Sequence, residues 1–364
     1  MIRYGFVGAG MMAQEHMRNI ALIDGACVSA FADPDEGMRS SATQLVPDAR
    51  EFSDYKEMLS ADLCDVYMVA SPNYLHHAAM LDLLPTGKPI LCEKPVCTTS
   101  TDARDLLRRA EGRAAPVWVA MEYRYMPPAQ RLLAELRAGR VGTPQMFAIR
   151  EHRFPFLPKV GGWNRFSAQT GGTMVEKCCH FWDLMRLVLE SDPVRIYCSG
   201  AMDVNHQDET YDGRKPDIID NAYAIVDFES GARGMLDLCM FAEGSYWQEL
   251  LTVTGEKARI EARVPGPARF SADKKERHSE ICISDRTTLR EEVFEVEVDP
   301  SILQAGDHHG STYYQHLKFI ELVRSGHGTP EVSLRDGLWS VVVGEAAEES
   351  ARSGQAIELK GRLA

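Results

Sequence analysis

The segment Gly8-Ala9-Gly10-Met11-Met12-Ala13 decides the fold of this chain. It follows an apolar run at 2–7 that has the pattern of a buried strand, and it leads into a helical pattern at 12–22. The spacing G-x-G-x-x-A between a strand and a helix is typical of the turn that holds a dinucleotide in a doubly wound sheet. The sequence therefore predicts a dinucleotide-binding domain in the first part of the chain.

Each small residue of this turn has its own task. The first glycine, Gly8, permits the tight turn, and Gly10 lets a pyrophosphate approach the backbone closely. Ala13 lets the helix pack near the sheet, and the N–H groups of the first helical turn point at the phosphates. The residues of the turn that we expect to contact the cofactor are Gly8, Gly10, Met11 and Met12.

Further short apolar runs follow, separated by helical patterns. They lie at 27–32, 65–70, 89–92 and 117–120. Strands that alternate with helices indicate βαβ units and a parallel sheet. We therefore assign residues 1–122 to a Rossmann domain with a doubly wound parallel sheet, which makes the fold class α/β.

The pattern changes after this domain. Period-two runs separated by turn residues predict antiparallel strands, and they lie at 145–152, 220–228, 232–240, 249–253 and 258–262. Helical patterns lie at 127–139, 313–324 and 334–352. We assign residues 123–364 to an α+β substrate-binding and oligomerisation domain with a large, mostly antiparallel, open-faced sheet. Its last helix could pack back on the first domain.

The composition is that of a globular protein, with 45% apolar and 26% charged residues. The formal net charge of −13 argues against nucleic acid or an anionic membrane as a partner. The nine cysteines show no C-x-x-C pair and no zinc-like spacing with histidine. Reduced thiols, no signal peptide and no bilayer-spanning apolar run lead us to expect a cytoplasmic protein.

Asp33 stands at the end of the second predicted strand. A carboxylate at this place accepts hydrogen bonds from both hydroxyls of the adenosine ribose and repels a 2′-phosphate. Pro34 follows it, rather than Arg or Ser. We therefore predict NAD as the cofactor in preference to NADP.

Two motifs point to a known family. They are Ala70-Ser71-Pro72-Asn73 and Glu93-Lys94-Pro95, each at the end of a predicted buried strand. Over nearly its whole length the chain resembles the Gfo/Idh/MocA oxidoreductases, which are glucose–fructose oxidoreductase and inositol 2-dehydrogenase-like proteins. The resemblance implies an NAD(P)-dependent dehydrogenase or reductase that acts on CH–OH groups of a sugar, an inositol or a related polyol.

A second matching block, GGTMVEKCCHFWD, runs from Gly171 to Asp183. The family usually reads Asp-x-Gly-x-His-x-x-Asp after its glycines. His180 and Asp183 match, whereas Glu176 replaces the Asp and Cys178 replaces the Gly. Spacings of four and three predict that Glu176, His180 and Asp183 share one helix face. The substitutions leave the exact substrate open.

Hydride transfer from a carbinol carbon needs a group that takes the hydroxyl proton. We expect Lys94 and His180 to do this work. One of them accepts the proton and the other polarises the substrate oxygen, and the sequence does not separate the two roles. Glu176 would orient them as a third catalytic residue, and Asp183 would bind a neighbouring hydroxyl. The alternative is that Lys94 forms a structural ion pair with Glu93.

Further residues are expected at the cofactor or the substrate. The resemblance implies polar contacts at the domain crossover, 122–125, and a Trp-Arg element near the cofactor. The expected cofactor contacts beyond the glycine turn are Asp33, Ser71, Asn73, His76, Glu93, Lys94, Trp163 and Arg165. The expected substrate contacts are Asp183, Arg124, Tyr125, Lys177 and His309. No metal ion is expected, because nothing at matching spacing completes a zinc site around His180.

Three functions fit these residues. The first is a sugar or polyol dehydrogenase with net turnover of NAD. The second is a glycoside hydrolase that oxidises a hydroxyl transiently, eliminates the aglycone and reduces again, for which Glu176 and Lys177 would suit the extra acid–base steps. The third is a non-catalytic regulator that binds a dinucleotide. Lys94 and His180 favour an enzyme, because a pure binder needs neither. By analogy with the family we expect a homodimer or homotetramer built on the open sheet face.

Overall fold

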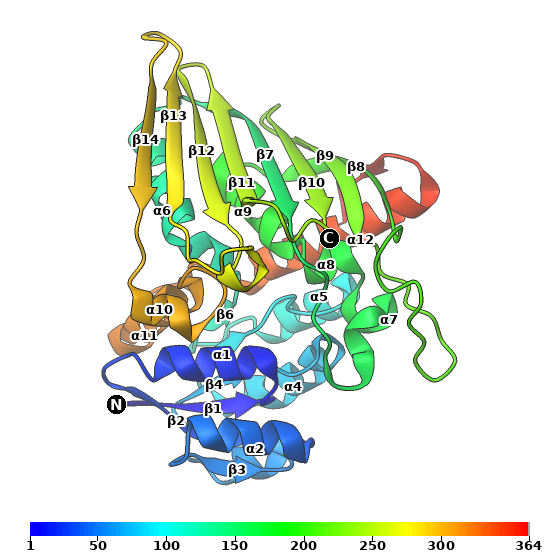
Figure 1. Cartoon of the computed structure of the whole chain (residues 1–364). Coiled ribbons are helices and arrows are strands. Elements are labelled where there is room, and N and C mark those ends of the chain that lie inside the picture. The colour runs from blue at the N-terminus through cyan, green and yellow to red at the C-terminus, as the bar shows by residue number, and fades with distance from the viewer. Residues whose placement is uncertain (363–364) are drawn as a thin grey trace. The chain divides into compact units, whose positions relative to one another are not determined.

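The computed structural model describes residues 1–362 and contains two compact units (Figure 1). The first unit comprises residues 1–125 and 299–341. The second comprises residues 126–298 and the chain from 342 onward. The boundary at 125 is close to the predicted division at 122. Residues 299–341 belong to the first unit, however, and of these only the start of the last helix is predicted to pack there.

All six strands of the first unit run parallel, in the order β3-β2-β1-β4-β5-β6. This is the Rossmann order and confirms the predicted doubly wound sheet. Every side chain of β4 is buried, as is typical of a parallel sheet covered on both faces. The strands are β1 (Ile2–Val7), β2 (Ala26–Ala32), β3 (Arg50–Phe52), β4 (Val66–Val69), β5 (Ile90–Cys92) and β6 (Val117–Val119).

Helix α11 belongs to the first unit because its inner side is buried there. Phe319 is fully buried, and its ring centre lies 6.2 Å from those of Tyr4 and Trp118. The α-helices of this unit are α1 (Met11–Ile20), α2 (Glu36–Leu45), α3 (Tyr55–Ser60), α4 (His76–Leu83), α5 (Ser100–Arg109), α10 (Pro300–Ala305) and α11 (Ser311–Ser325). Three short 3₁₀ turns are η1 (Asn73–Leu75), η2 (Leu84–Thr86) and η3 (Glu122–Tyr125).

The second unit is built on a nine-stranded sheet in the order β14-β13-β12-β11-β7-β10-β9-β8-β15 (Figure 1). Strands β7 and β10 pair in parallel, and the other neighbouring strands pair antiparallel, which confirms the predicted sheet. The strands are β7 (Pro144–His152), β8 (Pro193–Ala201), β9 (Asn221–Phe228), β10 (Arg233–Cys239), β11 (Trp247–Gly255), β12 (Ala258–Pro265), β13 (Ser279–Asp285), β14 (Glu291–Val296) and β15 (Ile357–Glu358).

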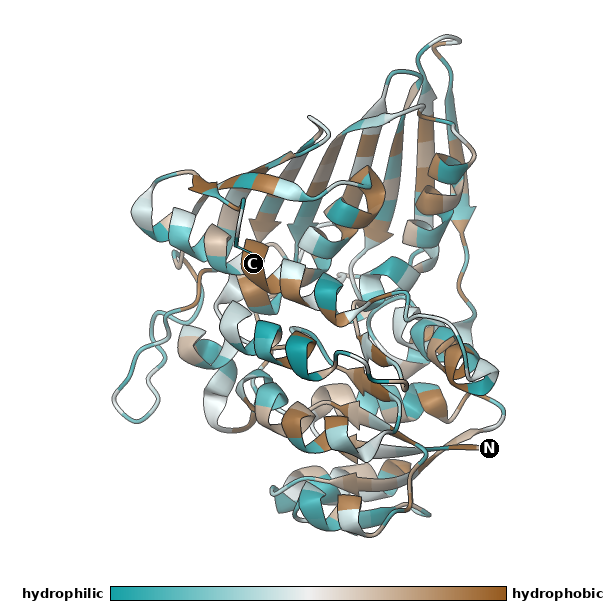
Figure 2. Ribbon diagram, turned by 180° about the vertical axis from the view of Figure 1, so that it is seen from behind, coloured by the Kyte–Doolittle hydropathy of each residue, from teal (hydrophilic) through white to brown (hydrophobic). Residues whose placement is uncertain are grey.

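Helices pack on this sheet: α6 contacts β12 and β13, and α9 contacts β7. Buried and exposed side chains alternate along β9, and Figure 2 shows the matching alternation of hydropathy along the strands. The helices are α6 (Pro127–Arg137), α7 (Ser167–Thr170), α8 (Thr173–Glu176), α9 (Cys179–Leu189) and α12 (Leu334–Ser353), with 3₁₀ turns η4 (Val160–Arg165) and η5 (Ala268–Phe270). Helix α12 begins within the residues of the first unit and continues in those of the second.

Seven of the nine cysteines are buried, and Cys27 and Cys239 are partly exposed. All nine are free thiols, and burial raises the pKa of the Cys92 and Cys178 thiols well above the ordinary value. Thiols in such surroundings are poor nucleophiles. Within residues 1–362, no helix is long and apolar enough to cross a membrane.

Candidate active site

The glycine turn connects β1 to α1 and approaches the loop after β4 very closely. Gly8 has φ +99°, and a Cβ on it would lie 2.7 Å from backbone atoms of Ala70 and Ser71. The packing of the chain itself therefore requires glycine at this position. The N–H of Gly8 donates to the carbonyl oxygen of Ala32 at 2.8 Å, which ties the turn to the end of β2.

Gly10, in contrast, is not required by the packing of the chain. Its φ of −70° is open to any residue, and a Cβ on it would meet no atom within 4 Å. Helix α1 starts at the next residue, Met11, with no side-chain cap and no acidic residue in its first turn. Open space in front of such a helix N-terminus fits the pyrophosphate of a dinucleotide.

Asp33 is held beside this turn. Its Oδ2 accepts a hydrogen bond from the N–H of Ala9 at 2.8 Å, and its Oδ1 accepts one from Asp35 at 2.9 Å. Each carboxylate oxygen has a second lone pair, so both can also accept a ribose hydroxyl. Arg39, which the sequence did not bring to our attention, donates to the carbonyl oxygen of Asp33 at 2.9 Å.

We expect Asp33→Ala to lower the preference for NAD over NADP by about tenfold or more, because a hydrogen bond to a charged group contributes about 1.5–3 kcal/mol. Calorimetry measures the ratio of the dissociation constants for NAD and NADP. We use the ratio because loss of the hydrogen bond from Ala9 would loosen the turn and weaken the binding of both cofactors alike. The control Asp35→Ala removes a carboxylate that caps α2 through the N–H of Met38 and should leave the ratio unchanged. An unaltered ratio in Asp33→Ala would mean that this carboxylate does not contact the ribose.

The loop after β4 carries buried polar atoms that suit a ligand. Within residues 1–362, the Ser71 hydroxyl and the Asn73 side-chain nitrogen are buried without a hydrogen-bond partner. Buried polar atoms are normally paired, so these two fit a group that the chain does not supply. His76 ties this loop to the next one: its Nε2 lies 2.9 Å from the carbonyl oxygen of Ser71 and its Nδ1 lies 2.8 Å from that of Pro95.

Lys94 follows β5 at the same edge of the sheet and is partly exposed. Its backbone N–H donates to Glu93 Oε2 at 3.1 Å. Burial alone would raise the pKa of Glu93, but the hydrogen bond from His16, with the charges of His16 and Lys94, keeps it below its ordinary value. Glu93 is therefore a buried anion beside Lys94, which is compatible with an ion pair and with an orienting role.

A buried chain of rings holds Glu93. His16 Nε2 lies 2.8 Å from Glu93 Oε1, His16 Nδ1 lies 2.8 Å from His316 Nε2, and His316 Nδ1 lies 3.2 Å from the Tyr4 hydroxyl. Burial first, and then the charge of His16, puts the pKa of His316 well below its ordinary value. The His316 ring is therefore neutral, and one of its two nitrogens donates while the other accepts. The sequence does not predict this series of hydrogen bonds, whose side chains come from α1, α11 and β1.

The crossover residues form η3 and are all buried. Arg124, expected at the substrate, donates from Nη1 to the carbonyl oxygen of Glu331 at 2.8 Å and so supports the fold of the first unit. Tyr125 is buried as well. His309 lies just before α11 with φ +52°, a left-handed backbone conformation in which His, Asn and Asp are the most frequent residues after glycine.

In the second unit, the Gly171–Asp183 block forms two helices, which corrects the expected single face. Glu176 ends α8, whereas His180 and Asp183 lie on α9. The helices separate where the N–H of Cys178 donates to the carbonyl oxygen of Thr173, five residues back, at 3.2 Å, which widens the turn. His180 and Asp183, three residues apart on α9, are both buried.

A lysine connects two of the predicted positions in this unit. Lys159 Nζ lies 3.8 Å from Glu176 Oε1 and 4.6 Å from the ring centre of Trp163. Arg165, on η4 with Trp163, is buried and donates from Nε to Glu209 Oε2 at 2.8 Å. The sequence points to neither Lys159 nor Glu209, because each lies in an irregular segment without a motif.

Lys177 has a role different from the expected substrate contact. It is buried, and its Nζ lies 2.9 Å from Glu151 Oε1 on β7. Glu249 on β11 pairs directly opposite Glu151 in the sheet. Burial first, and then the charge of Glu151, raises the pKa of Glu249 to about 7. Lys177 therefore forms an ion pair with one member of a buried carboxylate pair inside the second unit.

We expect Glu249→Gln to weaken the pH dependence of stability. A carboxyl whose pKa is higher in the folded than in the unfolded chain favours folding at low pH, and this contribution is lost as the pH rises from about 4.5 to about 7. Between pH 5.5 and pH 8 the free energy of unfolding, measured with urea, should fall by on the order of 2 kcal/mol less in the glutamine variant than in wild type. Burial also raises the pKa of Glu348 to about 7, so the variant should keep part of the pH dependence of stability. The exposed control Glu295→Gln should behave as wild type, and an equal pH dependence in Glu249→Gln would contradict the prediction.

The features described so far define a class of protein. A Rossmann sheet with a glycine turn, a carboxylate at the end of β2 and a lysine after β5, together with a second unit on an open-faced sheet, define an NAD-binding two-domain oxidoreductase. The chain belongs to the Gfo/Idh/MocA oxidoreductase family. The family model described as "Oxidoreductase family, NAD-binding Rossmann fold" matches residues 2–121, and the one described as "Oxidoreductase family, C-terminal alpha/beta domain" matches residues 134–359.

Individual relatives match along the whole chain. Myo-inositol 2-dehydrogenase of Thermotoga maritima is 22% identical over 99% of this chain and 99% of its own. D-apiose dehydrogenase of Paraburkholderia graminis is 26% identical over 97% of this chain and 88% of its own. Among solved structures, levoglucosan dehydrogenase in complex with NADH and levoglucosan has a TM-score of 0.82 at 18% identity and 99% coverage of both chains. This structural match shows a shared fold.

Proposed function

We propose that the protein is an NAD-dependent dehydrogenase or reductase that moves a hydride to or from a carbinol carbon of a sugar, an inositol or a related polyol. One observation carries the proposal: the open space at Gly10, before the N-terminus of α1, lies at the same edge of a parallel sheet as Lys94. Ligands of such sheets bind at this edge. The names of the inositol, apiose and levoglucosan dehydrogenases support the substrate class.

The residues divide the work as follows. Bound NAD accepts or returns the hydride. The glycine turn holds the pyrophosphate and Asp33 holds the ribose. Lys94 and His180 handle the proton of the substrate hydroxyl, one as acid–base and the other by polarising the oxygen. The anionic Glu93 keeps Lys94 in place, Glu176 orients the acid–base pair, and Asp183 accepts a hydrogen bond from a second hydroxyl.

A panel of substrates tests this function. The protein is mixed with NAD⁺ and, one at a time, inositols, aldoses and nitrophenyl glycosides, and both NADH and nitrophenol are followed by absorbance. We expect NADH to accumulate with at least one polyol or sugar. Release of nitrophenol without NADH would instead identify a redox-assisted glycoside hydrolase. Binding of NAD⁺ with neither product would identify a regulator.

We also propose a homodimer or homotetramer formed through the open face of the nine-stranded sheet. Ile225 on β9 is 53% exposed and pairs across with Tyr197 and Met235, which are exposed too, so the three form an apolar row. A second copy would cover this row. Sedimentation velocity at micromolar concentration should show a dimer or tetramer that Ile225→Arg shifts toward monomer. A monomeric wild type would contradict the proposal.

A further inference from the structure

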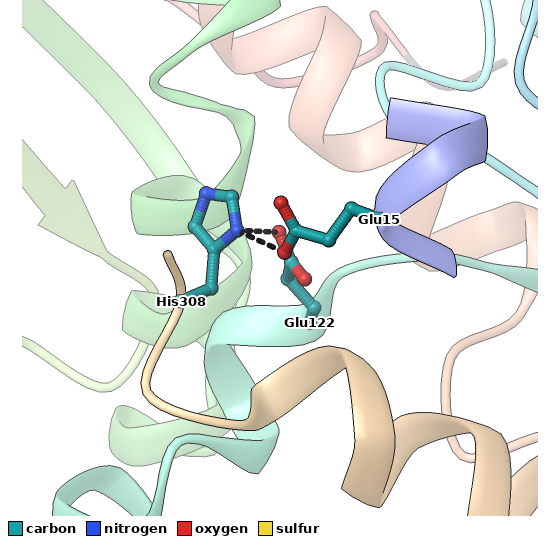
Figure 3. Close-up of side chains that lie close together, drawn as sticks. All are labelled: Glu15, Glu122 and His308. Atoms are coloured by element: carbon teal, nitrogen blue, oxygen red, sulfur yellow. Dashed lines mark hydrogen bonds and ion pairs between the residues drawn. The ribbon is translucent and has the colours of Figure 1, made fainter. Parts of the chain in front are cut away.

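Two carboxylates and an imidazole meet inside the first unit (Figure 3). Glu15 lies on α1, Glu122 begins η3 and His308 precedes α11, so the three come from segments far apart in the sequence. His308 Nδ1 lies 2.9 Å from Glu15 Oε1 and 3.6 Å from Glu122 Oε1. Figure 3 shows the three side chains pointing at one another, and one ligand atom from each lies within 4.8 Å of the others.

Hydroxyl groups orient the two carboxylates from outside. Thr312 Oγ1 lies 2.5 Å from Glu122 Oε2 and 3.2 Å from Glu15 Oε1, and Ser311 Oγ donates to Glu122 Oε2 at 3.2 Å. These bonds leave Glu122 Oε1 on the side of His308. Hydrogen bonds of this kind hold metal-ligating carboxylates in position. Thr312 has one hydroxyl hydrogen, however, and can donate it to one carboxylate at a time.

The two carboxylates of this cluster lie close together in the interior of the first unit. Glu15 is 6% and Glu122 1% exposed, and two ionised carboxylates this close repel each other strongly in the protein interior. The ring of His308 supplies at most one positive charge. The ring of His16, next to Glu15 in the sequence, is turned to Glu93 and His316. A divalent cation among the three side chains would offset this repulsion.

We propose that Glu15, Glu122 and His308 bind one divalent transition-metal ion such as Zn²⁺ or Mn²⁺. Ligands at 2.0–2.2 Å from a tetrahedral ion lie about 3.3 Å apart. The two separations from His308, 2.9 and 3.6 Å, lie on either side of this value. An imidazole ligand favours transition metals over Mg²⁺ and Ca²⁺, which prefer oxygen ligands alone. Three protein ligands leave a position for water, and the His308 side chain, 23% exposed, gives the ion a way in.

The bound ion joins three elements of the Rossmann unit. Helix α1 carries the cofactor turn at its N-terminus, η3 follows β6, and α11 is part of the segment that returns to this unit late in the chain. An ion that binds the folded chain and not the unfolded one raises stability in proportion to the logarithm of its concentration. The inference does not rest on the proposed function, because its test measures ion content and stability and no turnover.

Metal uptake by the full-length protein tests the proposal. The protein is stripped with a chelator, dialysed and titrated separately with ZnCl₂, MnCl₂ and MgCl₂, with calorimetry, elemental analysis and thermal unfolding as readouts. We expect about one equivalent of Zn²⁺ or Mn²⁺ per chain and a raised Tm, with no comparable effect of Mg²⁺. Glu122→Gln and His308→Gln should each weaken this binding by about 100-fold or more.

A second imidazole with two carboxylates in the same unit provides the matched control. His77 Nε2 lies 3.0 Å from Asp105 Oδ2 and His77 Nδ1 lies 3.8 Å from Asp102 Oδ1, but these groups are more exposed. His77→Gln should keep the wild-type stoichiometry and affinity. Loss of the ion in this variant, equal uptake in wild type and the cluster variants, or no uptake by wild type would each overturn the proposal.

A measurement on the wild type alone guards against variants that fail to fold. Co²⁺ bound at a site with an imidazole ligand and few waters gives strong visible absorption bands, whereas hydrated Co²⁺ absorbs weakly. We expect these bands to saturate at one equivalent and to disappear on addition of Zn²⁺. Their absence from folded wild-type protein would overturn the proposal without recourse to any variant.

Discussion

Lys94→Ala should lower kcat by about a thousandfold, since a positioned acid–base group contributes about 10²–10⁴ to a proton-transfer step. The dissociation constant for NAD should change little, because the pyrophosphate and ribose contacts lie at Gly10 and Asp33. Steady-state kinetics with the best substrate of the panel, together with calorimetry of NAD binding, check both parts. His180→Ala should show the same pattern, with a large loss of kcat and near-normal NAD affinity.

Two further variants separate the possible roles of this lysine. An arginine side chain retains a positive charge but cannot release its proton in a protein, so Lys94→Arg should remain inactive if the lysine accepts the proton. Recovery of a tenth or more of the activity in Lys94→Arg would mean that the charge alone matters. Lys88, just before β5 at the opposite end of the strand, is the matched control, and Lys88→Ala should keep kcat close to that of wild type. Near-normal turnover in Lys94→Ala would refute the assignment.

The sequence predicted β7 and β9 to β12 of the second sheet because their patterns are local, but it predicted neither β3 of the first sheet nor β8, β13, β14 and β15 of the second. On β9, Ala222, Ala224 and Val226 are buried while Tyr223 and Ile225 are exposed, so the period of two is visible in the letters themselves. The return of 299–341 to the first unit was not predictable in this way. Helix α11 buries polar His316 and Gln315 beside Phe319, so its pattern does not reveal the surface on which it packs.

The same distinction applies to the candidate site. Gly8 follows from a local backbone requirement, and the structure explains it by the close approach of Ala70. The ring chain from Glu93 to Tyr4 and the cluster at Glu15 join residues from separate segments, none of which has a motif of its own. The break between α8 and α9 was missed because a single five-residue turn at Cys178 shifts the register without any helix-breaking residue.

Gly10→Val should weaken NAD binding by about 100-fold or more while the protein stays folded. The side chain of valine would occupy the space that the pyrophosphate needs, and losing contacts worth about 2.7 kcal/mol corresponds to 100-fold in affinity. The fold should tolerate the change, because φ is −70° and a Cβ meets no atom of the chain within 4 Å. The lower capping preference of valine costs about 1 kcal/mol at most. Calorimetry with NAD and thermal unfolding measure the two effects separately.

Gly8→Ala provides the contrast, because a side chain at position 8 would meet the backbone of the chain itself. Its Cβ would lie 2.7 Å from the backbone of Ala70 in a conformation with φ +99°, so this variant should lose stability whether or not NAD is present. Gly8→Ala therefore tests space that the folded chain itself requires, whereas Gly10→Val tests space that the dinucleotide requires. If Gly10→Val bound NAD as tightly as wild type, the dinucleotide would not lie across this turn, and the roles given to Asp33 and Lys94 would fall with it.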